Sequence, residues 1–142
     1  MFRSQEMKKL LGIVVLSLLL SGNAYADKVF LKCEFVDGLN AWKDKSKNGV
    51  FRKGDLPDVG LEINTKSKKI FDTSYSDVPP DISIWDDNHV SWAQDPTVLL
   101  NHNSYGLDRL TGDLSRLKGY YDGSPLLSEI LNYKCSAANK LF

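Results

Sequence analysis

Alternation of apolar and polar side chains is the dominant pattern along this chain, and it predicts β-strands. It is clearest in residues 28–35, where every second side chain is apolar: Val29, Leu31, Cys33 and Phe35. A period of two places such side chains on one face of a strand. We therefore expect a half-buried strand with Cys33 pointing into the core.

Three further segments are predicted to be β-hairpins, because each has two alternating apolar runs around a polar turn. They are residues 60–72, 81–93 and 105–121. Val78-Pro79-Pro80 separates the first two, since its prolines exclude ladder pairing there. The lysine-rich residues 40–54 indicate a loop or weak hairpin that ends in a short strand near residues 50–53.

The hairpin at 81–93 holds the candidate binding residues. A three-residue turn at 86–88, with Asn88 in the left-handed conformation, puts four apolar side chains on one face. These four are Ile82, Ile84, Val90 and Trp92. Trp85 and His89 then share the other face. If that face is solvent, Trp85 and His89 form an exposed aromatic spot of the kind that binding surfaces use.

Residues 107–114, LDRLTGDL, are the most motif-like run of the chain. Catalytic sites usually gather residues from several elements, whereas these charges are local. We therefore predict a turn in which Asp108 accepts a backbone N–H and Gly112 takes a left-handed conformation. Leu107 and Leu114 should be cross-strand neighbours.

A second run, LEINTKSKKI at residues 61–70, has the same order of turn residues. Asn64 stands at the position of Asp108, and Lys68 at the position of Gly112. Since the charges differ while the turn residues correspond, the comparison favours a turn over a site.

The segment 124–132 is ambiguous between helix and strand. Ser124-Pro125 is typical of a helix start, but Leu131, Tyr133 and Cys135 also alternate. We favour a strand over residues 130–135, because it would let Cys135 meet Cys33.

In sum, seven or eight short strands without a long amphipathic helix predict an all-β, antiparallel fold. Cys33 and Cys135 lie 102 positions apart, unlike the close pair of a redox motif, and predict a structural disulfide between the first and last strands. Such a bond favours a closed sheet. We expect a small meander β-barrel, with a β-sandwich as the alternative.

The N-terminus is typical of a secretory signal peptide. Lys8 and Lys9 precede an 11-residue apolar run, and Ala24-Tyr25-Ala26 has the small-x-small pattern of a cleavage site. The run is shorter than the about 20 residues of a membrane span. We expect a signal peptide at 1–26, starting at Met1 or Met7, and one periplasmic or secreted domain at 27–142.

The charge of the chain after signal cleavage does not favour nucleic acid or a membrane surface as a partner. Removing Arg3, Lys8, Lys9 and Glu6 from 18 basic and 18 acidic residues leaves 15 basic and 17 acidic ones. A net charge of −2 gives no argument for nucleic acid or an anionic membrane surface.

Candidate chemistry is sparse. His89 and His102 are the two histidines, and neither belongs to a zinc ligand set. The run Asp86-Asp87-Asn88 is not a calcium loop, and a G-x-S-x-G motif is missing. The sequence thus predicts no catalytic residue, metal or cofactor. The enzymatic alternative is an envelope hydrolase with His102 or His89 beside an acidic residue.

The chain resembles small exported proteins of marine proteobacteria, most of them uncharacterised. The resemblance is carried by the N-terminal run from Met7-Lys8-Lys9-Leu10-Leu11-Gly12 through Ala24-Tyr25-Ala26, the cysteine near each end, Leu107-Asp108-Arg109 with Thr111-Gly112, and the final Lys140-Leu141-Phe142. More distantly it resembles small periplasmic β-barrel lysozyme inhibitors, although residues 27–142 lack their serine-glycine-x-x-tyrosine loop.

These observations lead us to expect a non-enzymatic periplasmic β-domain that binds a small ligand or an envelope protein. A lysozyme-inhibitor-like protein and an envelope hydrolase are the alternatives.

Overall fold

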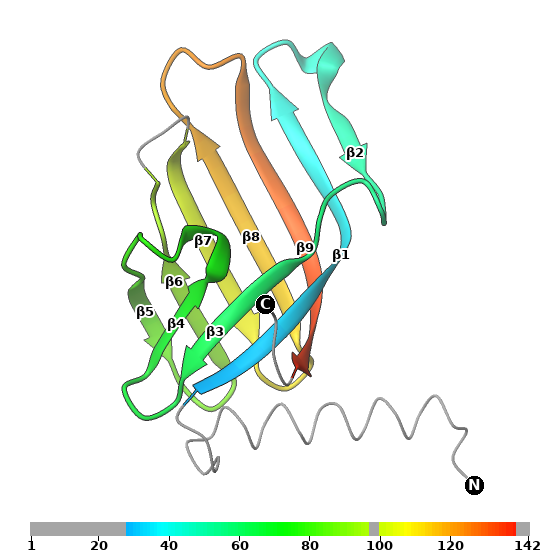
Figure 1. Cartoon of the computed structure of the whole chain (residues 1–142). Helices are drawn as coiled ribbons and strands as arrows, with labels where there is room; N and C mark the ends of the chain where they lie inside the picture. The colour runs from blue at the N-terminus through cyan, green and yellow to red at the C-terminus, as the bar shows by residue number, and fades with distance from the viewer. Residues whose placement is uncertain (1–27, 97–99, 139–142) are drawn as a thin grey trace, which may run out of the picture.

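The computed structural model describes residues 28–96 and 100–138, and this part of the chain is all β (Figure 1). Its only helical elements are two single turns of 3-10 helix, η1 (Lys45–Lys47) and η2 (Thr73–Tyr75). The nine strands are β1 (Lys28–Trp42), β2 (Gly49–Phe51), β3 (Val59–Asn64), β4 (Lys69–Asp72), β5 (Asp81–Trp85), β6 (His89–Ala93), β7 (Leu100–Asp108), β8 (Asp113–Tyr120) and β9 (Leu126–Ala138).

The strands form one antiparallel sheet that curls into a nearly closed barrel. Its order is β4-β3-β1-β9-β8-β7-β6-β5, and β2 pairs with β1 off this path. The run from β5 to β9 is a meander, as predicted, while β1 lies between β9 and β3. The two ends of the order, β4 and β5, are short strands, which limits the edge that they leave for other chains.

The disulfide joins the first strand to the last, as the sequence predicts. Cys33 and Cys135 are directly opposed in the β1–β9 ladder, with their Cα atoms 3.9 Å apart. These are the two longest strands, of 15 and 13 residues, and both run through the middle of the sheet. The bond therefore ties together the centre of the barrel wall.

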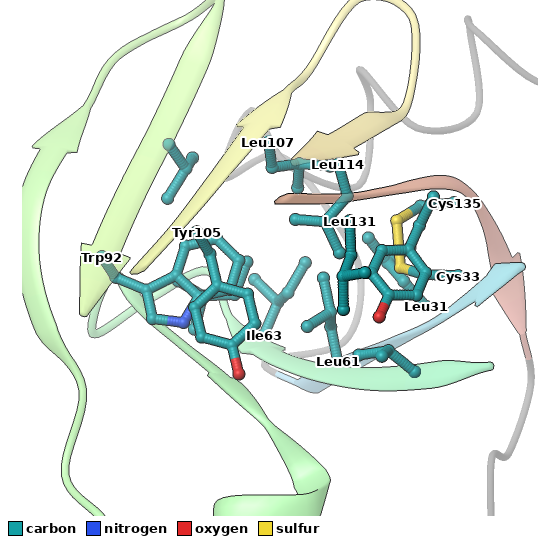
Figure 2. Packing of buried hydrophobic residues seen from close by; sticks show 14 of the residues in the cluster. Leu31, Cys33, Leu61, Ile63, Trp92, Tyr105, Leu107, Leu114, Leu131 and Cys135 are labelled. Carbon is teal, nitrogen blue, oxygen red and sulfur yellow. A yellow bond between two sulfur atoms is a disulfide. The ribbon is translucent and has the colours of Figure 1, made fainter. Parts of the chain in front are cut away.

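The barrel interior is packed with the apolar side chains that the alternation predicts. Leu31, Cys33 and Phe35 of β1 are buried, and Leu61 and Ile63 of β3 are fully enclosed. Figure 2 shows those of β1 and β3 that it labels, Leu31, Cys33, Leu61 and Ile63, in one cluster with side chains of β6 to β9, and Phe35 belongs to the same cluster. Within it, the rings of Trp92 and Tyr105 stack with centroids 4.7 Å apart.

A β-bulge in β1 reverses which face its side chains take. The β1–β9 register shifts between Phe35 and Asp37, so one extra residue lies in β1. Gly38 then points inward, where an added Cβ would lie 2.6 Å from the carbonyl oxygen of Ile130. Leu39 points outward as a result and is 54% exposed. An unbroken strand would have turned Leu39 to the core with Phe35.

The turn at 107–114 has the predicted geometry. Leu107 and Leu114 are paired and buried, and Gly112 has φ 79°. Asp108 Oδ1 accepts the backbone N–H groups of Leu110 at 2.8 Å and Thr111 at 3.1 Å. The run is therefore a hairpin turn whose carboxylate is used by its own backbone.

The matching turn between β3 and β4 is built in the same way. Asn64 Oδ1 accepts the N–H groups of Lys66 and Ser67 at 3.1 and 3.0 Å. Lys68, at the position of Gly112, has φ 55°. Ile63 pairs with Ile70 as Leu107 pairs with Leu114.

The predicted face assignment of the β5–β6 hairpin is wrong near its turn. A register shift between Ile82 and Ile84 marks a bulge, beyond which Trp85 pairs with Val90. Trp85 therefore packs against the core, while Ile84 is 45% exposed. Only Ile82, Val90 and Trp92 keep the expected face.

The predicted left-handed Asn88 is also wrong, because Lys68 is the one non-glycine residue with positive φ in the described part of the chain. Asp86 Oδ1 accepts the N–H groups of Asn88 and His89 at 2.9 and 2.8 Å. This side-chain acceptor closes the turn without a left-handed residue.

The C-terminal ambiguity is settled in favour of a strand. β9 runs from Leu126 to Ala138, longer than the predicted 130–135. Its pairing with both β1 and β8 supplies backbone partners on both edges, which a helix could not use. The predicted signal peptide lies outside the described residues, and within them there is no helix suited to crossing a membrane.

Candidate functional site

Four exposed apolar side chains form a row across the outside of the sheet. Leu117, Ile130, Leu39 and Val50 come from β8, β9, β1 and β2, and each is the direct cross-strand partner of the next. Their exposed fractions rise along the row from 40% to 64%. The water-facing side of an antiparallel sheet is normally polar, so this outer row is a candidate contact surface.

A groove encloses about 390 Å³ along three strands of this row. Its lining is mostly apolar and includes Leu39, Val50 and Ile130; Asn40, Asn48 and Ser128 are the residues with polar side chains along it. Pockets for small molecules have a volume of about 300–1,000 Å³ and a mostly apolar lining with a few polar groups. The groove has both properties.

Two asparagine side chains hold the shape of the groove. Asn40 Oδ1 accepts the N–H of Gly49 at 2.6 Å, and Asn48 Oδ1 accepts the N–H of Trp42 at 2.6 Å. One bond joins β1 to the first residue of β2, and the other joins β1 to the residue before it. They keep the β2 wall of the groove in place beside β1.

Inside the barrel lies a second candidate, a buried polar network. Tyr105 donates its hydroxyl to Asp72 Oδ2 at 2.7 Å and accepts from Asn103 Nδ2 at 2.8 Å. Arg116 Nε donates to Asn103 Oδ1 at 2.9 Å, and its Nη2 donates to the Tyr75 hydroxyl at 3.0 Å. The Arg116 guanidinium also lies 3.8 Å from Asp72 Oδ2.

Gln94 extends this network to the segment that follows β4. Its Oε1 accepts from the Asp72 N–H and from Trp92 Nε1, at 2.7 and 3.0 Å. Its Nε2 lies within 3.2 Å of the carbonyl oxygens of Tyr75 and Val78. Gln94 therefore holds residues 72–78 against the barrel interior.

The chemistry of the network is structural. Burial raises the pKa of the Tyr105 hydroxyl, and the Asp72 carboxylate adds to that rise, so Tyr105 keeps its proton. Asp72 and Asn103 are fully enclosed, which keeps them from a substrate. Buried polar groups that satisfy one another stabilise a unique packing.

Trp85 and His89, the predicted binding residues, do not lie together. Trp85 packs inward with Val90, whereas His89 lies on the outer face above Gly106. An added Cβ on Gly106 would lie 3.3 Å from the His89 ring. The bulge in β5 thus places Trp85 and His89 on opposite faces of the sheet, so they do not form the expected aromatic spot. A binding role for either residue alone stays a prediction.

His102, the other histidine, has a carboxylate beside it. Its Nδ1 lies 3.5 Å from Asp95 Oδ1, and both side chains are about half exposed. The same oxygen accepts the Asn103 N–H at 2.7 Å. Within the described residues no hydroxyl is hydrogen-bonded to His102, and no group of three His, Cys, Asp or Glu side chains could hold a metal ion.

The sequence patterns did not lead us to predict the outer row of apolar side chains, although one signal for it was present. Ile130 and Leu131 are consecutive apolar residues in a strand, so they must face opposite sides of the sheet. Leu131 is buried and Ile130 is 46% exposed. Leu39 had no such signal, because its outward direction depends on the bulge.

Comparisons with known proteins found no relative of this chain. No family model matches the chain, and neither a curated protein nor a solved structure matches it.

Proposed function

We propose that this protein is a non-enzymatic, exported binding domain that takes the apolar part of a small ligand in the groove between β9, β1 and β2. The observation that carries the proposal is the groove itself, lined by Leu39, Val50 and Ile130 on a face that should be polar. Burying such side chains under a ligand removes apolar surface from water, which favours binding.

The interior of the barrel supports an external site. Some small barrels hold a ligand inside. Here the interior positions of Leu31, Leu61 and Leu107 are fully enclosed by other side chains of the domain. Because side chains fill the interior of the barrel, a ligand would bind on its outer face.

Export is supported by the disulfide. Structural disulfides persist in oxidising compartments such as the periplasm or the extracellular space. The bond between Cys33 and Cys135 fits the signal peptide expected at residues 1–26.

An envelope protein as partner is the second candidate. The apolar row continues beyond the groove to Leu117, on the next strand. A stable protein interface covers about 800 Å² on each partner, more than the groove alone. The extension of the row favours this candidate over a lysozyme-inhibitor-like loop or a hydrolase.

The proposal is tested with dodecyl maltoside, a neutral amphiphile, below its micelle concentration. Calorimetry should detect binding to the protein, and Val50→Asp should weaken it about tenfold, since burying a valine contributes about 1.5 kcal/mol or more. Ile84→Asp is the control, because Ile84 is exposed on β5, away from the groove. Equal loss in both variants, or no binding to the wild type, would contradict the proposal.

A further inference from the structure

Basic residues are concentrated in one segment beside the groove. Residues 43–53, here called the basic hairpin, include η1 and β2. They contain Lys43, Lys45, Lys47, Arg52 and Lys53. Asp44 is their single acidic residue, so the segment has a net charge of +4. The rest of residues 27–142 then has 10 basic and 16 acidic side chains, a net of −6. The near balance of the whole domain hides this segregation.

The five basic side chains are exposed and available. None of them makes an ion pair within the part of the chain that the structure describes. The one carboxylate among them, Asp44, accepts from Ser46 Oγ at 2.7 Å and from Ser46 N at 3.1 Å. These hydrogen bonds lower the pKa of Asp44, so it remains a carboxylate engaged with its own turn.

The backbone places Lys47 and Arg52 of this segment close to residues that line the groove. Lys47 is next to Asn48, which lines the groove, and Arg52 follows two positions after Val50. Lys and Arg side chains bind carboxylates and phosphates through charge-assisted hydrogen bonds.

We propose that the ligand of the groove is a single-chain anionic amphiphile. Its acyl chain lies on Leu39, Val50 and Ile130, and its acidic head group is bound by the basic hairpin. This inference rests on the proposed function and adds the charge of the ligand. A cationic head group would be repelled at this place, and a neutral one would gain only the apolar contact.

Three probes with the same dodecyl chain test the charge: dodecanoate, dodecyl maltoside and dodecyltrimethylammonium, each below its micelle concentration. Binding to the purified protein, with its disulfide intact, is measured by calorimetry. Dodecanoate should bind about tenfold more tightly than the maltoside, and the ammonium compound most weakly. High salt should remove the advantage of dodecanoate and leave the maltoside unchanged.

Two matched triple-lysine variants test whether the acidic head group binds at the basic hairpin. Lys43→Gln/Lys45→Gln/Lys47→Gln removes three charges from the basic hairpin. Lys66→Gln/Lys68→Gln/Lys69→Gln removes three exposed charges at the opposite end of β1, in the β3–β4 hairpin. Only the first triple should lose the advantage of dodecanoate, and neither should change the affinity for the maltoside.

The outcomes separate this inference from the function on which it rests. If the maltoside and dodecanoate bind equally and neither triple variant changes their binding, the proposal of an anionic ligand is wrong. The proposal of an apolar binding groove is then still supported. An equal effect of both triples would assign the preference to net charge and overturn the role of the hairpin. Binding to phosphatidylglycerol vesicles, without binding of free dodecanoate, would replace the single-chain ligand by a membrane surface. If no probe binds, both proposals fail.

Discussion

Lys68 and Gly112 occupy the same position in two hairpin turns, with φ of 55° and 79°. A left-handed conformation costs a residue with a Cβ about 1–2 kcal/mol, whereas glycine adopts it freely. Both turns are closed by a side-chain oxygen, from Asn64 or Asp108, that accepts two backbone N–H groups. The carboxylate of LDRLTGDL thus has the same role as an uncharged amide.

Lys68→Gly should raise the free energy of unfolding by about 0.5–1 kcal/mol, because relief of the left-handed strain exceeds the entropy that glycine adds to the unfolded chain. Gly112→Ala should lower it by about 1 kcal/mol or more, for the opposite reason. Urea denaturation measures both changes, which should shift the midpoint of unfolding and leave the dependence of the free energy on urea concentration unchanged. Shifts of the same sign in the two variants would contradict the shared turn geometry.

At the scale of elements, the two longest strands determine where the site lies. β1 pairs with β3 through Lys28–Cys33 and with β2 through Gly38–Asn40. The bulge between these halves changes which face is apolar. The first half of β1 therefore builds the core and the second half builds the groove, while the disulfide anchors the first half to β9.

Replacing both cysteines, Cys33→Ala with Cys135→Ala, should lower the free energy of unfolding by up to about 4–5 kcal/mol. The bond closes a loop of about 100 residues in the unfolded chain, and that constraint is lost. Denaturation curves of the double variant and of the wild type under reducing conditions should show a similar loss. A double variant as stable as the oxidised wild type would show that the paired strands alone supply the constraint.

At the scale of the whole molecule, burial of ionisable groups links stability to pH. Burial raises the pKa of Tyr105 and Tyr133 and, together with Glu129, that of Tyr120. Burial lowers the pKa of Lys118, and the nearby Arg116 lowers it further. These groups act in opposite directions at alkaline pH.

Stability should fall as the pH rises above about 10, the ordinary pKa of tyrosine. Below that pH both states keep the tyrosine protons; above it the unfolded chain loses them while the folded barrel retains them, which favours unfolding. Lys118 has the reverse effect below its ordinary pKa of 10.5, because there the unfolded chain binds the extra proton.

Denaturation at a series of pH values from neutral to alkaline measures both effects. Lys118→Met should remove a rise of stability before pH 10 and keep the later fall. A flat alkaline profile in the wild type would contradict the retention of the tyrosine protons.

Local patterns account for much of the fold. The hairpin turns, the inward face of residues 29–35 and the pairing of Cys33 with Cys135 each depend on chemistry visible within a few residues or on the oxidised cysteine pair. The directions of Leu39 and Trp85 could not be predicted in the same way. Each follows a bulge, and one inserted residue reverses a strand whose side-chain period is two.

The sequence by itself determined that this is a β-protein, where its hairpins turn and which cysteines join, because those properties depend on local alternation, turn chemistry and the cysteine count. Only the tertiary structure decided the candidate site. Leu39, Val50, Ile130 and Leu117 are far apart in the chain and become one row through pairing between four strands. The register of that pairing follows from bulges whose positions depend on the neighbouring strand, and no local pattern specifies them.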